Sequence, residues 1–355
     1  MAFLDFKNVR IAGFAASVPK RKICNLDITD ISHDYDSSAF VQTTGVLERH
    51  VDELTTSDLC VPAAERLIED LKWNKSDIDA VIFVSQYTDY ILPATACIVQ
   101  DRLGLSKECY ALDVSLGCSG WVYGMSTLAS LLGKDKIKKG LLMVGDGKRR
   151  AKYDDPLFGY AGAVTALEYQ EGEKGFKFHF GTDGSGYDAI IVPDGGSRNP
   201  FSSESLLVED VEGRSLHRLQ SRMKGMDVFS FGITTAPKSI RLLAEHFGFD
   251  YLDTDYFIFH QANLKMNNMI AKKLQLDMEK VPSSMRYFGN TSSASIPLTI
   301  VTQLKDKIEG THTKFIGCGF GVGLSWGTIA FETNNIVVTD LVEVDSKEAD
   351  IEHVV

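Results

Sequence analysis

Three residues of this sequence, a cysteine, a histidine and an asparagine, occupy positions from which they could carry out acyl transfer. Cys118 lies in a segment of small residues, 115–120, directly after an apolar run. His260 directly follows the apolar run DYFIF, and Asn290 lies in the glycine- and serine-rich stretch GNTSSAS. A cysteine sulfur can hold an acyl group as a thioester, and imidazole and amide N–H groups can stabilise an oxyanion. The three residue types therefore indicate acyl transfer through a cysteine thioester.

The surroundings of Cys118 are typical of a nucleophile at the start of a helix. Residues 110–114 predict a buried strand, and Trp121, Met125 and Leu128 recur at helical spacing after the turn. We expect the partial positive charge of the helix N-terminus to favour the thiolate and to lower the pKa of the Cys118 thiol. The small neighbours would leave room for a substrate. The alternative is a buried cysteine with a structural role, the commoner fate of an unpaired cysteine.

The histidine and the asparagine suggest neutral hydrogen-bond donors. The His260 Nε2–H and the Asn290 amide could stabilise the enolate that forms when a malonyl thioester loses carbon dioxide. The backbone N–H groups of Cys118 and Gly323 could hold a second oxyanion, at the carbonyl of the acyl-cysteine. Other interpretations stay open at this point: a core histidine, a turn or N-cap asparagine, and a papain-like cysteine hydrolase with the same residue types.

Strands and helices alternate along the chain and would position these residues. The apolar spacing predicts a helix at 57–71, capped by Ser57 or Asp58, and further helices at 95–103, about 120–132, from 226 onward and at 264–274. Residues 43–50 predict a turn followed by a basic edge. Strands are predicted at residues 9–14, 79–85, 110–114, 140–144, 159–169, 176–181, 255–259, 314–317 and 326–333.

The second half of the chain repeats the pattern of the first. DAVIFVSQ (79–86) is echoed by DYFIFHQ (255–261), and LLMVGDG (141–147) by KFIGCGFG (314–321). This predicts a duplicated α/β unit whose halves bring the carboxyl ends of their strands to one shared centre. We divide the chain into an N-terminal half (1–182), a connecting and capping region (183–225), a C-terminal half (226–333) and an acidic extension (334–355). We expect the extension to be solvated.

The composition limits the function classes. The chain has 355 residues and a net charge of −11, which argues against nucleic acid as a partner because phosphate binding needs clustered Lys and Arg. Its six cysteines are scattered without C-x-x-C spacing, so we expect neither a metal site nor a disulfide framework. The apolar runs are shorter than the roughly 20 residues of a membrane span, and charges interrupt the apolar N-terminal residues. We therefore expect a cytoplasmic protein without a secretory signal or membrane insertion.

Four motifs, in this order, resemble those of the β-ketoacyl-[acyl-carrier-protein] synthase III family, the initiating condensing enzymes of the thiolase superfamily. They are DVSLGCSGW, FHQANLK, FGNTSSASIP and GFGVGLSWG, and the resemblance runs from about residue 9 to residue 331. It implies an α/β fold of the thiolase type with five αβαβα layers, a homodimer, and decarboxylative Claisen condensation in fatty acid, specialised lipid or polyketide biosynthesis. By position, Cys118 would take the acyl group, and His260 and Asn290 would promote decarboxylation.

The resemblance also implies partners and secondary roles. Phe320 matches the family phenylalanine near the nucleophile, Leu92 matches a residue lent across the dimer to the partner's acyl pocket, and Lys265 matches the residue that docks acyl carrier protein. The substrates would be acyl thioesters of coenzyme A or of the carrier protein, and no cofactor or metal is implied. Because the carrier is acidic, docking needs a local basic patch. The residues that could extend this patch are Arg214, Arg218, Arg222, Lys224 and the run 148–152.

One segment departs from the family pattern. Initiating enzymes carry a Trp and an Arg before TGV that hold the adenine end of coenzyme A, whereas this chain has Ala39 and Thr43 in the shortened segment SSAFVQTTG. The family's GDGAGA is GYAGAV here, at residues 159–164. We therefore expect a divergent synthase that is primed by a carrier protein in a specialised pathway.

Two further functions are alternatives to condensation. An acyltransferase of the same fold would form an ester or amide from the acyl-cysteine and would have little use for Asn290. A non-condensing partner subunit would tolerate loss of the thiol, and the intact set of Cys118, His260 and Asn290 argues against it.

Overall fold

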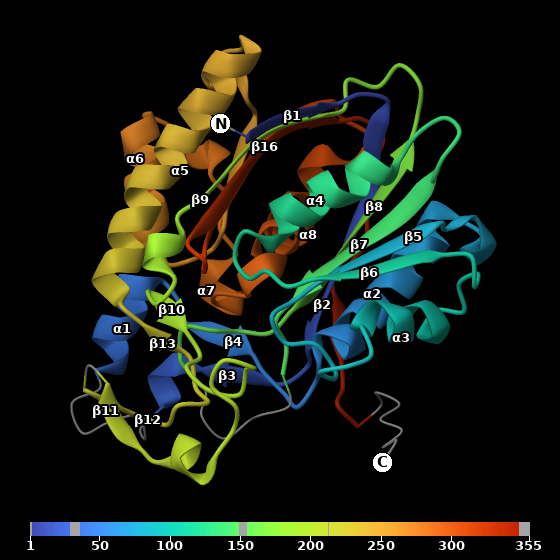
Figure 1. Ribbon diagram of the computed structural model, residues 1–355. Coiled ribbons are helices and arrows are strands. Elements are labelled where there is room, and N and C mark those ends of the chain that lie inside the picture. Colours follow the sequence, from blue (N-terminus) through green and yellow to red (C-terminus); the bar gives the residue numbers. More distant parts are fainter. Residues whose placement is uncertain (1, 29–35, 149–154, 212, 348–355) are drawn as a thin grey trace.

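Two β-sheets form the frame of the molecule (Figure 1). The structure is a computed structural model that describes residues 2–28, 36–148, 155–211 and 213–347. The first sheet contains, in spatial order, β17 (Val337–Val338), β2 (Val9–Pro19), β8 (Gly162–Tyr169), β7 (Lys139–Gly145), β5 (Ala80–Val84) and β6 (Tyr110–Val114), with β18 (Val342–Val344) also paired to β2. The second contains β1 (Ala2–Phe6), β9 (Phe176–Thr182), β16 (Ser325–Thr333), β15 (Thr313–Gly321) and β14 (Tyr256–Phe259).

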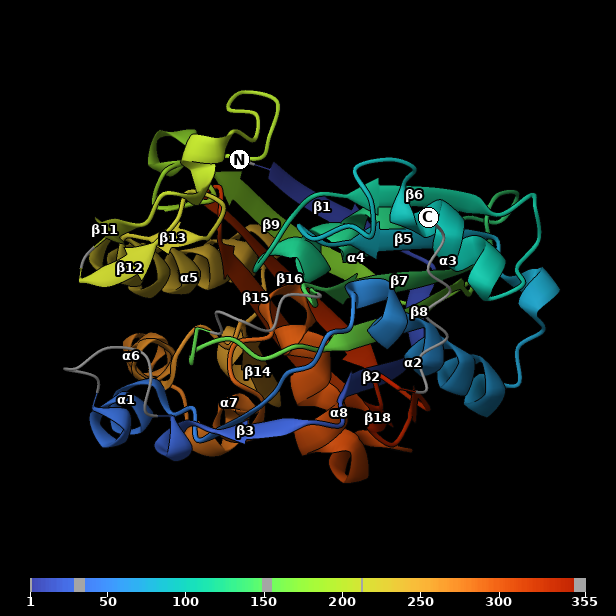
Figure 2. The same ribbon diagram turned by 90° about the horizontal axis from the view of Figure 1, so that it is seen from below.

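Helices lie between the two sheets and cover their outer faces, which gives five layers (Figure 2). The central layer is α4 (Gly120–Leu131) and α8 (Ser295–Ile308). α2 (Thr56–Leu71) and α3 (Thr95–Arg102) cover the first sheet, and α5 (Gly225–Phe247) and α6 (Leu264–Leu274) cover the second. Most of α4 is buried, as a helix between two sheets requires, and Trp121 packs there with its indole N–H 3.0 Å from Thr165 Oγ1. The expected five-layered α/β fold is confirmed.

The two sheets follow the same path, which confirms the internal duplication. The series β2-β8-β7-β5 and β9-β16-β15-β14 each contain two antiparallel contacts followed by a parallel one. In the parallel contacts, Val84 pairs with Val144 in the first sheet, and Phe259 pairs with Cys318 in the second. Counting onward from these pairs makes Ser85 equivalent to His260 and Asp146 equivalent to Phe320.

The ends of the chain cross between the halves, which corrects the predicted boundaries. β1 and β9 belong to the second sheet, although both lie within residues 1–182. β17 and β18 pair in parallel with β2 of the first sheet, so the expected solvated extension is wrong for residues 336–344. Val338 is only 2% exposed, and three acidic residues between positions 340 and 345 form ion pairs with lysines: Asp340 with Lys305, Glu343 with Lys22 and Asp345 with Lys20. Residues 348–355 lie outside the described ranges.

Three local elements differ from those expected. α2 begins one residue earlier, and its N-cap is Thr55, while Asp58 completes the capping box by accepting the Thr55 N–H at 3.0 Å. The segment expected as a turn contains the end of α1 (Ser37–Thr44) and β4 (Glu48–His50), which pairs with β3 (Lys22–Cys24). β15 continues through the glycine-rich run because it pairs with β16 along its whole length.

The region between the halves covers one end of the molecule. It contains two short antiparallel pairs, β10 (Ile190–Ile191) with β13 (Arg222–Met223) and β11 (Glu209–Val211) with β12 (Arg214–Leu216). These pairs lie beside the start of α5 (Figure 1). A short helix, α7 (Met285–Phe288), leads into the asparagine segment.

Candidate active site

Cys118, His260 and Asn290 line one cavity of about 780 Å³. Cys118 lies just before α4, Asn290 lies before α8, and His260 directly follows β14. The N-terminal half therefore supplies the sulfur, and the C-terminal half supplies the imidazole and the carboxamide. Phe320, from the end of β15, lines the same cavity.

The sulfur of Cys118 is closely approached by the end of β15. A Cβ atom at Gly321 would lie 2.6 Å from Cys118 Cβ and 2.8 Å from its Sγ, so only glycine fits at this position. The next residue, Val322, places its backbone N–H in hydrogen-bonding contact with the sulfur. Gly323 is not among the residues that line the cavity. The backbone donor expected at Gly323 is therefore found at Val322, because β15 extends further than predicted.

The thiol of Cys118 is held in its protonated form, contrary to expectation. Burial and, after it, the nearby Asp146 carboxylate raise the pKa of Cys118 from 9.0 to about 11. Hydrogen bonds from the Val322 N–H and the Ser292 hydroxyl oppose this rise without cancelling it. A helix N-terminus contributes only about 0.3–1 kcal/mol, which is less than one pKa unit. The predicted lowering of the thiol pKa is therefore wrong, because desolvation and a like charge outweigh the helix end.

His260 is a neutral imidazole. Burial lowers its pKa to about 4, and a hydrogen bond with the Ser292 backbone opposes this only in part. Nδ1 lies 2.9 Å from Ser295 Oγ, and the same oxygen accepts the Gln261 N–H at 3.3 Å. Because Gln261 already donates to that oxygen, the Ser295 hydroxyl proton is available to Nδ1, which favours the ring proton on Nε2. His260 then presents an N–H donor to the cavity.

Asn290 is fixed so that its amide nitrogen is the group available to the cavity. Its Oδ1 accepts the Ser292 N–H at 2.9 Å. Its backbone is tied to the facing segment by two hydrogen bonds, from Asn290 N to Leu157 O at 2.9 Å and from Gly159 N to Asn290 O at 3.2 Å. With its oxygen occupied, the side chain can donate from Nδ2 to an oxyanion.

Phe320 forms an apolar wall next to His260. The two ring centroids lie 5.8 Å apart with an interplanar angle of 82°, an edge-to-face contact. Phe320 is buried, as is the imidazole that it touches. This wall keeps water from the imidazole and helps to explain why its pKa is so low.

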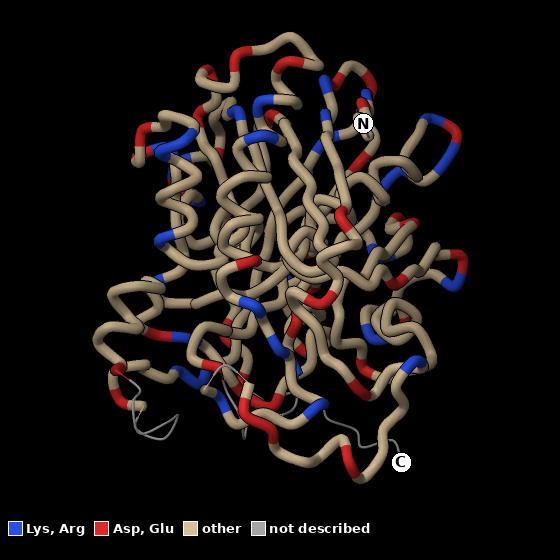
Figure 3. Tube along the Cα trace, turned by 60° about the vertical axis from the view of Figure 1, so that its left-hand side comes forward, with Lys and Arg blue, Asp and Glu red and all other residues tan. Residues whose placement is uncertain are grey.

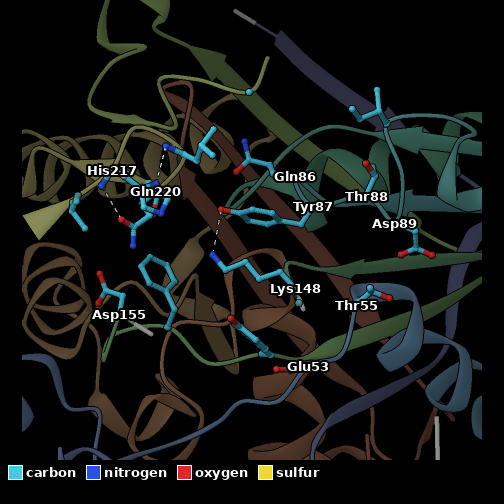
Figure 4. Close-up of a pocket in the computed structure, with 18 of the residues that line it drawn as sticks. Glu53, Thr55, Gln86, Tyr87, Thr88, Asp89, Lys148, Asp155, His217 and Gln220 are labelled. Carbon is cyan, nitrogen blue, oxygen red and sulfur yellow. Dashed lines mark hydrogen bonds between the residues drawn. The ribbon is translucent and has the colours of Figure 1, made fainter. Parts of the chain in front are cut away.

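A second and larger hollow, of about 1110 Å³, adjoins the cavity (Figure 4). Gln86, Tyr87, Lys148 and Arg214 are among the residues that line both spaces. Figure 4 shows Lys148 extended toward Tyr87, with Nζ 3.5 Å from the hydroxyl and 4.5 Å from the ring centroid. None of the three residues that define the inner cavity lines this outer hollow. The chemistry therefore belongs to the inner cavity, and the outer hollow lies on the approach to it.

Comparison with known proteins identifies the family. Residues 112–184 match the family model 3-oxoacyl-[acyl-carrier-protein (ACP)] synthase III, and residues 244–333 match its C-terminal counterpart. A β-ketoacyl-[acyl-carrier-protein] synthase III of Clostridioides difficile is 36% identical over 330 residues, which is 89% of this chain and 96% of that one. The chain belongs to the β-ketoacyl-[acyl-carrier-protein] synthase III family. A second relative, from Desulfitobacterium hafniense, is 31% identical over 328 residues and covers 90% of this chain and 96% of its own.

Solved structures agree with the assignment to the synthase III family. The crystal structure of a 3-oxoacyl-(acyl-carrier protein) synthase from Burkholderia xenovorans has a TM-score of 0.88 and 36% identity, covering 97% of this chain and 99% of that one. The priming β-ketosynthase of the R1128 polyketide pathway, with a TM-score of 0.77 and 22% identity, shares the fold. As a synthase III family member this protein is a condensing enzyme, which confirms the function implied by its four motifs.

The family residues outside the cavity lie on the surface. Leu92 is 80% exposed and its neighbour Ile91 is 98% exposed, in the loop before α3. Lys265 is exposed near the start of α6, with Nζ 5.9 Å from the Phe229 ring centroid.

The basic residues expected to extend a docking patch are largely neutralised. Each of four pairs with a carboxylate: Arg214 with Asp155, Arg218 with Asp194, Arg222 with Glu209, and Lys224 with Asp188. Lys148 faces the cavities, and residues 149–152 lie outside the described ranges. Along the chain, basic and acidic residues alternate rather than form large blocks of one sign (Figure 3). Each of these four residues is therefore already held by a carboxylate of the same chain, and its part in carrier docking stays a prediction.

Of the helices in the described ranges, none combines the length and apolar character needed to span a bilayer. No group of three or more His, Cys, Asp or Glu side chains in the described part of the chain is placed to hold a metal ion.

Sequence reasoning missed three groups at the sulfur: Asp146, Ser292 and the Val322 N–H. Asp146 lies directly after β7, where the rule that chemistry collects at strand carboxyl ends could have found it. Ser292 lies two residues after Asn290, in the stretch considered only as a helix cap. No sequence signal marks Val322, because its position depends on the extent of β15.

Proposed function

We propose that Cys118, His260 and Asn290 carry out acyl transfer and decarboxylative Claisen condensation. The observation that supports this most directly is that the sulfur, the imidazole and the carboxamide line the same cavity. Such a cavity can hold an acyl group on sulfur while a second thioester enters beside it.

The geometry suggests how charge would be stabilised in each step. Sulfur attacks the primer thioester, and the N–H groups of Cys118 and Val322 hold the oxyanion while the primer's thiol leaves. The malonyl donor then loses carbon dioxide, and the electron pair of the broken C–C bond forms an enolate. His260 Nε2–H and Asn290 Nδ2–H stabilise its oxygen. The enolate carbon attacks the acyl-cysteine carbonyl, the C–S bond breaks, and the β-ketoacyl thioester is released.

The decisive experiment separates condensation from simple acyl transfer. Asn290→Ala should still accept an acyl group on Cys118, seen as a mass increase of the intact protein. It should release carbon dioxide from a malonyl carrier thioester about 100- to 1000-fold more slowly. Asn334→Ala, at an exposed asparagine near the chain end, is the matched control. If Asn290→Ala condenses at the normal rate, the enzyme is instead an acyltransferase that forms an ester or amide.

We also propose that a carrier protein, rather than coenzyme A, delivers the primer. The exposed face of α1 carries Ala39 and Thr43, and this helix contains no aromatic residue except Phe40, which lines the cavity. A surface of this kind offers neither stacking nor a cation to an adenine nucleotide. Purified enzyme should be acylated faster by acyl-carrier protein than by the same acyl group on coenzyme A. Equal or faster acylation by the coenzyme A thioester would exclude this proposal.

Carrier docking is proposed at Lys265. This lysine is exposed at the start of α6, and no ion pair involves it within the ranges that the structure describes. A single exposed cation can steer an acidic partner, although its contribution to affinity is small. Lys265→Glu should raise the KM for the carrier protein, while Lys272→Glu, at the far end of the same helix, should not. Unchanged KM in Lys265→Glu would place docking elsewhere.

We infer that the enzyme is a cytoplasmic homodimer without a resident cofactor. The exposed apolar loop Tyr90, Ile91 and Leu92 supports the dimer, because such residues are normally covered at an interface. Leu92→Asp should reduce the mass measured by light scattering from that of two chains to that of one. Leu252→Asp, at another exposed leucine, should leave it unchanged. A monomeric wild-type protein would exclude the proposal.

A further inference from the structure

Asp146 is an enclosed carboxylate that the steps above do not use. It follows β7 directly and lines the same cavity as Cys118. Ser85 Oγ and the Gln86 N–H both donate to its Oδ1, at 3.0 and 2.8 Å. The equivalent position in the other half of the molecule is Phe320, so the fold does not require a carboxyl group here. An ionisable side chain in this place needs a chemical explanation.

One hydroxyl group joins this carboxylate to the sulfur. Cys118, Ser292 and Asp146 line the same cavity, and the Ser292 hydroxyl lowers the pKa of both the thiol and the carboxyl group, which places it next to each of them. Ser292 is held in place by its N–H, which donates to Asn290 Oδ1, and its backbone has the unusual φ of 51° for a residue with a side chain. Gly117 leaves room for this group, since a Cβ there would lie 3.5 Å from Ser292 Oγ and 2.6 Å from Gln86 Oε1. Sulfur, hydroxyl and carboxylate therefore lie together in one cavity.

The thiol needs a base, and the imidazole is poorly suited to be one. With a pKa of about 11, only roughly one Cys118 in ten thousand is ionised at pH 7. The thiol is a much weaker nucleophile than the thiolate. His260, with a pKa of about 4 and its proton favoured on Nε2, has little capacity to accept another proton at the cavity.

We propose that Asp146 accepts the proton of the Cys118 thiol through Ser292 and returns it to the departing thiol. This proposal rests on the proposed function of Cys118 as the acylated residue. In the forward step the S–H bond breaks, Ser292 Oγ takes that proton and passes its own to Asp146, and sulfur bonds to the acyl carbon. When the primer's C–S bond breaks, its sulfur takes the proton back along the same path. No net proton is gained or lost, and no redox change occurs.

The roles of the two residues in this relay differ. Ser292 touches the reacting sulfur and is the catalytic residue of the pair, whereas Asp146 acts through it as a positioning residue. The ionisable and charged groups that share the cavity with Asp146 are Cys118, His260, Tyr87, Tyr160, Lys148, Asp155 and Arg214. Of these, Lys148 is near enough to favour the ionised carboxylate. Asp155 is paired with Arg214 and is thereby held by a cation of its own.

The test uses the pH dependence of Cys118 modification, which a purely structural role would not alter. The full chain reacts with iodoacetamide between pH 5 and 10, and labelling is read at the Cys118 peptide by mass spectrometry. With the relay, the wild-type rate reaches a plateau well below pH 11. In Asp146→Asn and Ser292→Ala the plateau is lost, and the rate rises about tenfold per pH unit. At pH 7, acylation by a carrier thioester should fall about 100-fold in both variants.

The control is Ser293→Ala, which removes a buried neighbouring hydroxyl for which no hydrogen-bond partner is found among the described residues. It should retain the wild-type plateau. If Asp146 only repels the thiolate, Asp146→Asn will react faster than wild type at every pH below 11, and the relay is excluded. The relay is also excluded if both variants keep the plateau. If wild-type Cys118 shows the plateau but is never acylated, the proposed function fails while the relay stands.

Discussion

The two halves of the molecule place different chemistry at equivalent points of the same scaffold. Three pairs of positions correspond between the first and the second sheet. Cys118 and Asn290 precede the two central helices. Ser85 and His260 directly follow β5 and β14. Asp146 and Phe320 each lie two residues beyond the paired residues Val144 of β7 and Cys318 of β15. The second half offers two neutral donors beside an apolar wall. The first half offers the nucleophile and, in Asp146, a carboxylate that lines the same cavity.

This difference shows how a duplicated fold can divide one reaction between its two halves. Stabilising an enolate oxygen requires donors that stay neutral, which burial against Phe320 provides for His260. Activating a thiol requires a proton acceptor, which Asp146 can supply and a phenyl ring cannot. The same strand end therefore serves as an insulating wall in one half and as an acid–base group in the other.

The largest effect is expected from a substitution that disturbs the close contact between Gly321 of the second half and Cys118 of the first. Gly321→Ala places a methyl group within 2.8 Å of Cys118 Sγ, so the sulfur or β15 must move. Acylation of Cys118 should slow about 100-fold or more, since misplacement by an ångström costs that much. Single-turnover acylation followed by intact-protein mass spectrometry measures it. Gly196→Ala, where a Cβ would meet nothing within 4 Å, should behave as wild type. Normal acylation of Gly321→Ala would mean that the sulfur is not confined by β15.

The next largest effect is expected at β17, the strand near the end of the chain that pairs with β2 of the first sheet. Val338→Ala removes buried methyl groups where β17 meets β2, and should lower the free energy of unfolding by about 2 kcal/mol. Urea denaturation measures this change. Glu343→Ala, exposed on β18, should change the stability by less than about 0.5 kcal/mol. A Val338→Ala protein as stable as wild type would show that the tail strands add nothing to the first sheet.

A smaller effect is expected from the hydroxyl group that orients His260, one of the two hydrogen-bond donors of the second half. Ser295→Ala removes the hydroxyl that favours the Nε2–H tautomer of His260. Carbon dioxide release from the malonyl donor should slow about tenfold, less than the loss of a donor itself. Acylation of Cys118 should be unaffected, and this split distinguishes a tautomer effect from general damage. Thr302→Ala, on the next turns of α8, should change neither rate. Equal loss of both steps in Ser295→Ala would contradict the assignment.

The smallest expected effect is a difference between His260 and Asp146 in how each changes the stability of the protein with pH. The pKa of His260 is lowered from 6.5 to about 4, so its unfolded form binds more protons and stability is lost as pH falls through this window. Between pH 7 and 5.5 this amounts to about 1 kcal/mol, and His260→Gln should remove that share of the acid sensitivity. The pKa of Asp146 is raised, mainly by burial, so its cost to stability appears as pH rises.

Asp146→Asn should accordingly gain stability over wild type near neutral pH, and the gain should shrink on acidification. Urea titrations of both variants at several pH values measure the two slopes. His50 and His179, whose pKa values are also lowered by burial, act in the same direction as His260 in every variant and cancel in the comparison. If the stability difference from wild type changes with pH in the same direction for His260→Gln and Asp146→Asn, the proposed contrast between the two residues is wrong.

Much of this arrangement could be predicted from the sequence because it depends on local patterns. The apolar spacing predicts the helix Leu264–Leu274 with its observed bounds, and the structure adds Asn263 as its N-cap. The echo between DAVIFVSQ and DYFIFHQ indicated the duplication. The positions of Cys118, His260 and Asn290 at element ends then indicated a common centre.

The features that sequence reasoning missed depend on contacts between distant segments. The thiol pKa is governed by burial and by Asp146 from another strand, and neither is visible in the residues around Cys118. The shift from Gly323 to Val322 follows from the register of β15 with β16. The acidic residues of the tail predict a solvated segment, whereas lysines elsewhere in the fold pair with three of them.

The crossing of the chain ends determines where this protein can be divided. β1 completes the sheet of the second half, and β17 and β18 extend the sheet of the first. A cut in the connecting region would leave each fragment holding an edge strand that belongs to the other, with an unfilled sheet border of its own. Both ends of the chain therefore join the two halves, and neither half holds all the strands of its own sheet.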